Sequence, residues 1–375
     1  GALPYAPFID YKICLRSKGE DCGLCKSACP VDDAFNYDDK ENIIERNIGA
    51  IVIAIGSELY DCSNIPNLGR GKLEDIYTGA EFERMLSSNG PTDGEIRTSS
   101  GIRPESAAII HCVGSLDKNH REYCSGVCCQ YAFKFNHIIE KKLPGTKIYH
   151  FYKMLSVPGK EEFTLYNHAM ENHNATFIRY NDIRDINVNE KGGKKSVKFK
   201  DAAGKKGTVP VDMVILCPAV VPAEDSVKLG AVLEAAQDKF GFFEELHGRL
   251  DSSQSKIKGV YLAGTCQSPM DIQKAMSQGM AVAGHILSGL VVGRKLEINP
   301  ITAVIDSERC SGCRVCISVC PYKAIAFDAD KEVSAVTDVL CQGCGACVAA
   351  CPCSAIKSNH FTNEEIIAEI EGVLA

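Results

Sequence analysis

The chain has 375 residues, 45% of them hydrophobic, so it is long enough to bury cores in two or three domains. Its 41 basic and 48 acidic residues give a net charge of −7. That balance excludes the strongly basic surface with which proteins bind nucleic acid or anionic membranes.

Neither a membrane span nor an export signal is expected in this sequence. The longest apolar stretch, at residues 279–293, is shorter than the roughly 20 residues that cross a bilayer. The first residues lack the basic and apolar regions of a signal peptide, which predicts a cytoplasmic protein. In that reducing compartment the 20 cysteines are expected to be metal ligands rather than disulfides.

Near the N-terminus four cysteines follow the pattern Cys-x7-Cys-x2-Cys-x3-Cys-Pro. They are Cys14, Cys22, Cys25 and Cys29. The pattern resembles half of a two-cluster ferredoxin with a stretched first spacing, and we assign residues 1–40 to such a partial segment. In two-cluster domains the proline-linked cysteine binds the opposite cluster. Two alternatives therefore stay open: one cluster uses all four thiolates, or a missing segment or a partner chain supplies the complement.

Residues 41–105 are predicted to be part of a flavin-binding domain. A buried strand is expected at residues 48–56, and it ends at Gly56 like the strand that returns beneath a flavin in two-dinucleotide-domain reductases. A buried strand that ends in glycine is also typical of an ordinary core. No G-x-G-x-x-G follows an N-terminal strand, which predicts that the first half of the flavin domain is not in this chain.

Residues 106–220 are predicted to form a domain that resembles half of a dinucleotide-binding βαβ unit. Strands are expected at 107–113 and 147–152, and a helix begins near residue 127. In such a unit a glycine-rich turn holds a pyrophosphate at the helix N-terminus, but here the turn contains four cysteines. They are Cys112, Cys124, Cys128 and Cys129. The helix N-terminus could stabilise an anionic cluster, yet a redox-active thiol pair or packed cysteines fit the spacing equally well.

Residues 221–296 are predicted to return to the flavin domain. A strand at 259–264 precedes a helix that begins near residue 271, and this segment resembles the flavoprotein segment whose turn and helix N-terminus hold the ribityl and phosphate groups of the flavin. The candidate FAD contacts are Gly56, Gly264, Thr265, Gln267, Asp271 and Ile272.

Residues 297–360 contain the pattern Cys-x2-Cys-x2-Cys-x3-Cys-Pro twice, 31 residues apart, which is typical of a bacterial two-[4Fe–4S] ferredoxin. The fourth cysteine of each run reaches the other cluster. One cluster is therefore assigned to Cys310, Cys313, Cys316 and Cys351. The other is assigned to Cys341, Cys344, Cys347 and Cys320.

Structural zinc is the alternative at this domain, but it prefers paired C-x2-C knuckles without the third cysteine and the proline. Residues 361–375 are predicted to form a C-terminal helix. Four cysteines lie outside every ligand-like group and are interpreted as packing residues. They are Cys62, Cys217, Cys266 and Cys353. His111, beside Cys112, is interpreted as a satisfied, partly buried histidine rather than a hydrogen-bond donor to a cluster.

Short sequence motifs along the whole chain resemble those of the A-subunit family of heterodisulfide reductase and its relatives. They are Glu81-Phe-Glu-Arg-Met-Leu86, Asn89-Gly-Pro91, His111-Cys-Val-Gly-Ser115, Tyr123-Cys-Ser-Gly-Val-Cys-Cys129, Ala263-Gly-Thr-Cys-Gln267, Met270-Asp-Ile272 and the tandem ferredoxin pattern. The resemblance implies an α/β core of two dinucleotide-binding domains, thioredoxin-reductase-like and incomplete at its N-terminus, plus an α+β ferredoxin domain. It also implies that Cys112, Cys124, Cys128 and Cys129 bind a [4Fe–4S] cluster. The family usually carries arginine where this chain has Leu116 and Gly126, and the lost charge should lower a nearby cluster's potential.

By this resemblance the chain is expected to be an oxidoreductase subunit that relays electrons between FAD and about four [4Fe–4S] clusters, and in some members bifurcates them. FAD binding is expected to need the missing N-terminal half or a partner chain. The expected partners are heterodisulfide reductase B- and C-like subunits, a hydrogenase or formate dehydrogenase, and soluble ferredoxin. The alternatives are a flavin-free electron relay, an NAD(P)H-dependent reductase, or the equivalent component of an aryl-CoA-reducing or quinone-linked complex.

Overall fold

The computed structural model describes residues 9–31, 34–37, 43–289 and 301–374. The chain divides into two units, Gly1–Ile48 and Gly49–Ala375. In the first unit a 3-10 turn, Arg16–Lys18, lies between Cys14 and Cys22, and the short helix α1, Leu24–Ala28, contains Cys25 and ends just before Cys29. All other elements belong to the second unit.

A five-stranded parallel sheet forms the largest part of the second unit, with the order β3-β10-β4-β5-β6. Its strands are β3 (Ile76–Thr78), β10 (Met213–Pro218), β4 (Ser106–Val113), β5 (Lys147–Tyr152) and β6 (Ala175–Arg179). Strand β4 is buried along nearly its whole length, as expected for a central strand covered on both faces.

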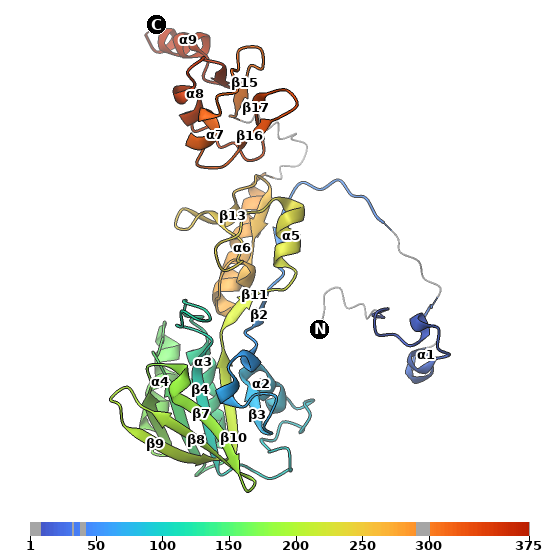
Figure 1. Cartoon of the computed structure of the whole chain (residues 1–375), viewed down its shortest axis with the longest axis vertical. Coiled ribbons are helices and arrows are strands. Elements are labelled where there is room, and N and C mark those ends of the chain that lie inside the picture. Colours follow the sequence, from blue (N-terminus) through green and yellow to red (C-terminus); the bar gives the residue numbers. More distant parts are fainter. Residues whose placement is uncertain (1–8, 32–33, 38–42, 290–300, 375) are drawn as a thin grey trace. The chain divides into compact units, whose positions relative to one another are not determined.

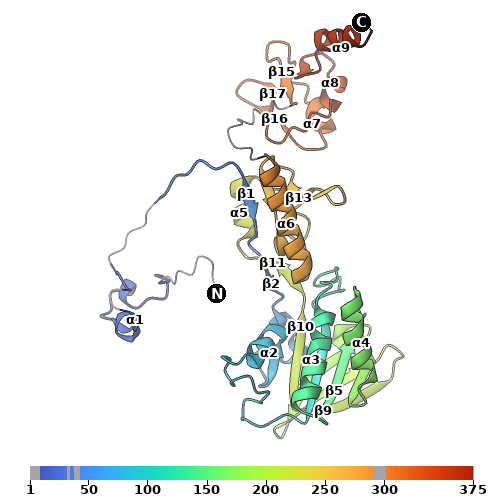
Figure 2. The same cartoon turned by 180° about the vertical axis from the view of Figure 1, so that it is seen from behind.

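Different elements cover the two faces of this sheet (Figures 1 and 2). Helices lie on one face: α2 (Gly79–Leu86), α3 (Cys128–Lys142) and α4 (Lys160–Glu171). An antiparallel sheet lies on the other: β7 (Ile186–Lys191), β8 (Lys194–Lys200) and β9 (Lys206–Val211). Because side chains of a strand alternate, Ile109 of β4 packs among the helices, whereas Ile110 packs with the β7–β9 sheet.

A second sheet has the order β1-β14-β13-β12, and β1 runs parallel to β14. Its strands are β1 (Ile51–Ile53), β14 (Val260–Leu262), β13 (Asp251–Ser255) and β12 (Glu245–His247), and the helices of this part are α5 (Ser226–Leu233) and α6 (Ile272–Gly289). Ile53, Phe243 and Leu262 lie in its core. A two-stranded ribbon of β2 (Ser57–Leu59) and β11 (Val220–Pro222) joins it to the five-stranded sheet.

The C-terminal part is built from two similar halves. Its elements are β15 (Ala303–Ile305), α7 (Val315–Val319), β16 (Ile325–Asp328), β17 (Val333–Val336), α8 (Ala346–Ala350) and β18 (Ile356–Ser358). Strand β15 pairs with β18, and β16 pairs with β17, both antiparallel. Helix α9 (Asn363–Leu374) follows, as the sequence predicts.

The predicted fold class, an α/β core with a separate α+β domain, is confirmed. The domain boundaries stay predictions, and one detail differs from them: β3 and α2 precede residue 106, yet β3 pairs with β10 in the five-stranded sheet. Within the residues that the structure describes, every helix is too short or too polar to cross a bilayer.

Candidate iron–sulfur and flavin sites

The N-terminus of helix α3 carries two of the four cysteines that replace the nucleotide-binding turn. Cys128 and Cys129 are its first residues, each 2% exposed, and no side chain caps the helix. Its first backbone N–H groups therefore lack an intrahelical or side-chain partner, and the helix dipole favours an anion at this end. Cys112, also 2% exposed, lies at the adjacent end of β4.

Two of these thiols converge on one backbone carbonyl. The Sγ atoms of Cys112 and Cys129 lie 3.7 and 3.9 Å from the carbonyl oxygen of Met154. The amide of Gly126 donates to Cys124 Sγ at 3.4 Å in the preceding loop. Cys112 has a φ of 58°, a left-handed conformation that costs a non-glycine residue about 1–3 kcal/mol and concentrates at functional sites.

The acidity of these thiols is set by how closely they lie together. The pKa of Cys129 is lowered, first by a hydrogen bond with Cys128 and further by His111. The pKa of Cys128 is raised by the same bond and by burial, and burial raises the pKa of Cys112. A buried thiolate needs a cation beside it, and a thiol that coordinates a metal is deprotonated outright. This donor set therefore fits a metal cluster.

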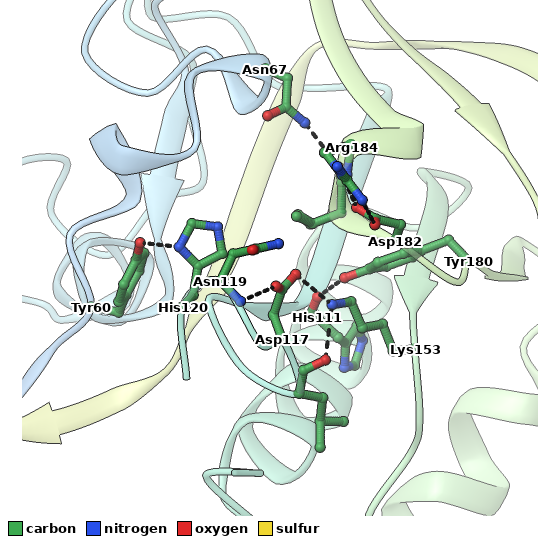
Figure 3. A network of polar contacts seen from close by, with 12 residues as sticks. Tyr60, Asn67, His111, Asp117, Asn119, His120, Lys153, Tyr180, Asp182 and Arg184 are labelled. Carbon is green, nitrogen blue, oxygen red and sulfur yellow. Dashed lines mark hydrogen bonds and ion pairs between the residues drawn. The ribbon is translucent and has the colours of Figure 1, made fainter. Parts of the chain in front are cut away.

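The loop between Cys112 and Cys124 is held by polar contacts from other segments (Figure 3). Lys153 Nζ donates to Asp117 Oδ2 at 3.0 Å and to the carbonyl of Leu116 at 3.1 Å. Tyr60 Oη and His120 Nδ1 are 2.7 Å apart. These contacts anchor the loop between the first and second cysteines of the site.

We predict that replacing Lys153 with methionine destabilises the protein by about 3 kcal/mol, because it leaves the carboxylate of Asp117 buried without its cation. The two side chains are 10% and 9% exposed. The matched control is Lys134→Met. Lys134 pairs with Glu83, but these side chains are 41% and 51% exposed, so the loss should be under about 1 kcal/mol. Chemical denaturation of both variants measures the difference.

The same pair has a defined pH dependence. Burial alone would raise the pKa of Asp117, but the amide of Asn119 and the ammonium of Lys153 lower it below its ordinary value. The ion pair therefore stabilises the folded protein at pH values above the ordinary pKa of an aspartate. This contribution is lost as the pH falls through the lower pKa that Asp117 has in the folded protein. The stability gap between wild type and Lys153→Met should stay constant between about pH 6 and pH 8. A gap that closes within this range would contradict the ion pair.

In the C-terminal part, each of the two predicted groups of four cysteines lines one cavity. One is lined by Cys310, Cys313, Cys316 and Cys351. The other is lined by Cys341, Cys344, Cys347 and Cys320. These are the two groups that the crosswise assignment predicts. The structure brings each group together, and the role of its members as ligands stays a prediction.

Backbone amides point at several of these sulfurs. The amides of Ala324 and Ala355 each donate to the cysteine four residues earlier, Cys320 and Cys351, at 3.3 Å. The two bonds occupy equivalent positions in the two halves of the repeat and have the same length, so the internal repeat extends to the hydrogen bonds. Amide donors to sulfur offset the negative charge of a cluster and raise its reduction potential.

Two glycines of the repeat differ in how much space surrounds the position that a Cβ atom would take. Gly312 has a φ of +65°, and a Cβ there would lie 2.6 Å from the carbonyl oxygen of Glu332. We predict that Gly312→Ala destabilises this part by more than about 2 kcal/mol. Gly345, with a φ of +75° and nothing near its Cβ position, is the control, and Gly345→Ala should cost about 1 kcal/mol. The guanidinium concentration at which cluster absorbance disappears measures both, and equal midpoints would contradict the crowding.

The remaining cysteines divide by location. Cys62, Cys217 and Cys266 are buried in hydrophobic clusters, and burial raises the pKa of Cys62 to about 12, as expected for inert packing residues. Cys353 lines the Cys310 cavity and its Sγ lies 3.1 Å from Ser311 Oγ. The N-terminal group, residues 14–29, lies in the first unit, and its assignment to one cluster stays a prediction.

A cavity of about 820 Å³ lies beside the N-terminus of α6, and Gln267 and Asp271 line it. The other candidate FAD contacts, Gly56, Gly264, Thr265 and Ile272, are not among its lining residues. Gly56 and Gly264 have φ values of 74° and 78°, and a Cβ on Gly56 would lie 4.0 Å from Thr265 Oγ1, so these three lie together. The volume and mixed polar lining fit a dinucleotide cofactor.

Sequence reasoning missed two residues of this cavity. Gln278 Oε1 accepts from the amide of Gly264 at 2.7 Å, and Glu245 Oε2 accepts from Gln267 Nε2 at 2.9 Å. Asp271, Lys274 and Gln278 follow the i, i+3, i+7 spacing of one helix face. That spacing could have predicted from the sequence that Gln278 lies on the same side of the helix as Asp271. No sequence pattern pointed to Glu245, which comes from β12.

The chain was compared with known proteins. A family model described as a 4Fe-4S dicluster domain matches residues 302–352. The A subunit of the H(2):CoB-CoM heterodisulfide,ferredoxin reductase of Methanothermobacter thermautotrophicus is 37% identical, over 100% of this chain and 55% of that protein. The iron-sulfur A subunit of the CoB--CoM heterodisulfide reductase of Methanocaldococcus jannaschii is 36% identical, over 100% of this chain and 56% of that protein.

The chain is homologous to the A subunits of heterodisulfide reductase. It spans about half the length of these curated relatives. The family resemblance that the sequence motifs indicated is thereby confirmed. Among solved structures, a thioredoxin reductase from Lactococcus lactis has a TM-score of 0.41 and 14% identity, covering 64% of this chain and 65% of that one.

Proposed function

We propose that this chain is an oxidoreductase subunit that relays electrons between a flavin and a series of [4Fe–4S] clusters. The observation that supports it most is the set of cysteines at the N-terminus of α3, where a dinucleotide-binding unit holds phosphate. Buried thiols that lie close together at a helix N-terminus fit metal ligation better than nucleotide binding. The two cysteine-lined cavities of the dicluster domain would supply further relay centres.

The protein's own part in this function is to position centres and set their potentials. A bound flavin exchanges electron pairs, whereas each cluster passes single electrons. We propose about four clusters, one for each group of cysteines. Amides of residues such as Ala324 and Gly126 donate to the cysteine sulfurs and stabilise their negative charge. At the cavity beside α6, Gln267 and Asp271 would contact FAD, whereas Gly56, Gly264 and Thr265 lie together outside its lining.

The partners are proposed from the names of the relatives. These include H(2):CoB-CoM heterodisulfide,ferredoxin reductase and Ferredoxin:CoB-CoM heterodisulfide reductase. We infer a cytoplasmic complex with B- and C-like subunits, a hydrogenase or formate dehydrogenase, and soluble ferredoxin; in some members of the resembling family the flavin supplies the chemistry for electron bifurcation. An aryl-CoA-reducing or quinone-linked complex would use the same architecture, and the proteins that co-purify with the chain distinguish these assemblies.

Reductive titration under anaerobic conditions tests the relay. We expect dithionite to bleach the visible absorbance of the purified chain and reduced ferredoxin to do the same, while NADH and NADPH leave it unchanged. Reduction by a nicotinamide would contradict the proposal and favour the reductase alternative. A sample that binds no FAD would instead favour the flavin-free relay.

A further inference from the structure

Four buried polar side chains form a row that leads to the cysteines at α3. His111 lies on β4, His150 on β5, Asn136 on α3, and Asn172 at the end of α4. The first three are 0% exposed and Asn172 is 7% exposed. His111 Nε2 lies 2.9 Å from His150 Nδ1, His150 Nε2 lies 2.8 Å from Asn136 Nδ2, and Asn172 Nδ2 donates to Asn136 Oδ1 at 3.1 Å.

The direction of every bond in this row follows from one backbone amide. The N–H of Asn174 donates to Asn172 Oδ1 at 2.9 Å, so the other end of that amide, Nδ2, is the donor to Asn136. Asn136 then accepts at Oδ1 and donates from Nδ2 to His150 Nε2. Because a neutral imidazole has one donor and one acceptor, His150 carries its proton on Nδ1.

The same logic fixes the proton of His111. His150 Nδ1–H donates to His111 Nε2, so His111 carries its proton on Nδ1. Burial, and then His111, lower the pKa of His150 well below its ordinary value, so that ring stays neutral as these bonds require. His150 also stacks on Phe177, with ring centroids 4.6 Å apart and planes within 2°. Tyr180 Oη donates to the carbonyl of His111 at 2.6 Å and fixes its backbone (Figure 3).

The Nδ1–H of His111 is left without an acceptor. Nδ1 is buried and has no hydrogen-bond partner among the residues that the structure describes. The interpretation of His111 as a satisfied histidine is therefore wrong at this atom, because burial is complete and only Nε2 is bonded. His111 directly precedes Cys112 on β4, its ring centroid lies 6.0 Å from that of Phe133, and Phe133 packs in one cluster with Cys129, while Nε2 is already bonded to His150. A buried N–H beside metal-ligand thiols calls for an acceptor at the metal site.

We propose that His111 donates an Nδ1–H hydrogen bond to the cluster held by Cys112, Cys124, Cys128 and Cys129. His150, Asn136 and Asn172 are positioning residues that hold His111 in this tautomer. A hydrogen bond to a cluster sulfur stabilises the reduced, more negative state and raises the reduction potential. The inference rests on the proposed function only in that these cysteines bind a cluster.

Substitutions in the row test the inference in the whole chain, prepared anaerobically. The probe is the EPR signal that Cys128→Ala removes, followed by redox titration and by pulsed EPR in H2O and D2O. In the wild type we expect an exchangeable proton and a histidine nitrogen coupled to this signal. His150→Phe keeps a ring against Phe177 but cannot donate to His111. It should lower the midpoint potential and remove the proton coupling, with the iron content unchanged.

Two further variants separate the hydrogen bond from packing. His150→Gln restores a donor toward His111 and should return the potential and the coupling toward wild type. Asn136→Asp keeps the volume but can only accept, so it reverses the row and leaves His111 Nδ1 without a proton; the coupling should disappear. His137→Phe, on the same helix and outside the row, is the control and should change neither readout.

The outcomes distinguish this inference from the proposed function. If Cys128→Ala removes no iron, no cluster is present and the proposed function itself fails at this site. If the cluster is present but its signal shows no exchangeable proton, or if His150→Phe and Asn136→Asp leave potential and coupling unchanged, His111 is not a donor to the cluster and only this inference is overturned.

Discussion

Replacing Cys128 with alanine should remove about four iron atoms per chain and one reduced-cluster EPR signal, while the other clusters remain. Cys128 is the first residue of α3, where the unpaired backbone N–H groups and the other thiols of the site meet. Alanine is an excellent helix residue, so the helix itself is preserved. Iron and acid-labile sulfide per chain, with EPR after dithionite reduction, measure the loss.

Cys217→Ala is the matched control for this experiment. Cys217 is buried and packs in the same hydrophobic cluster as Cys128, but it lies on β10 and outside every ligand group. Its replacement removes the same atoms from the same core, so any loss of iron through packing should appear in both variants. We expect full iron in Cys217→Ala. Full iron in Cys128→Ala as well would contradict the cluster and favour a redox-active thiol pair.

Replacing Cys320 with serine should remove the cluster of Cys341, Cys344 and Cys347, not the cluster of its own run. Cys320 lines the cavity of the second run, and the amide of Ala324 holds its sulfur there. The expected loss is again about four iron atoms. EPR of the reduced domain should also change, because two neighbouring paramagnetic clusters interact and a single cluster does not.

Pairs of substitutions determine which cluster is lost. Because Cys320 and Cys344 are assigned to one cluster, the double variant Cys320→Ser, Cys344→Ser should lose no more iron than either single variant. Cys320→Ser with Cys313→Ser should lose two clusters. Cys353→Ser, beside the first cavity, is the control and should keep its iron. The opposite pattern of additivity would show that each run binds its own cluster.

The ferredoxin domain could be predicted in detail because its pattern is local. Each run places three cysteines within one tight loop, and the proline after the fourth directs that cysteine away, so spacing alone implies the crosswise grouping. What the spacing does not show is the close approach of backbone carbonyls, those of Glu332 and Ile301, to the glycines at 312 and 343. The five-stranded core was predicted in part, from the buried run of β4 and the strand at 147–152.

The polar row behind Cys129 could not be predicted, because its members come from four segments that only the fold brings together. Asn136 and His150 sit at positions that read as ordinary helix and strand residues. Glu245 reaches the α6 cavity for the same reason, through a strand that carries no motif. Strand β3 joins the sheet of the following segment, a pairing between residues far apart in sequence that short apolar runs do not encode.

The most direct test is the metal content of the chain purified without oxygen, measured together with Mössbauer and EPR spectra. We predict about 16 iron atoms and as many sulfide ions per chain, arranged as [4Fe–4S] clusters that dithionite reduces. A colourless sample without iron, or one in which zinc occupies the cysteine sites, would contradict the assignment of these thiolates to electron transfer.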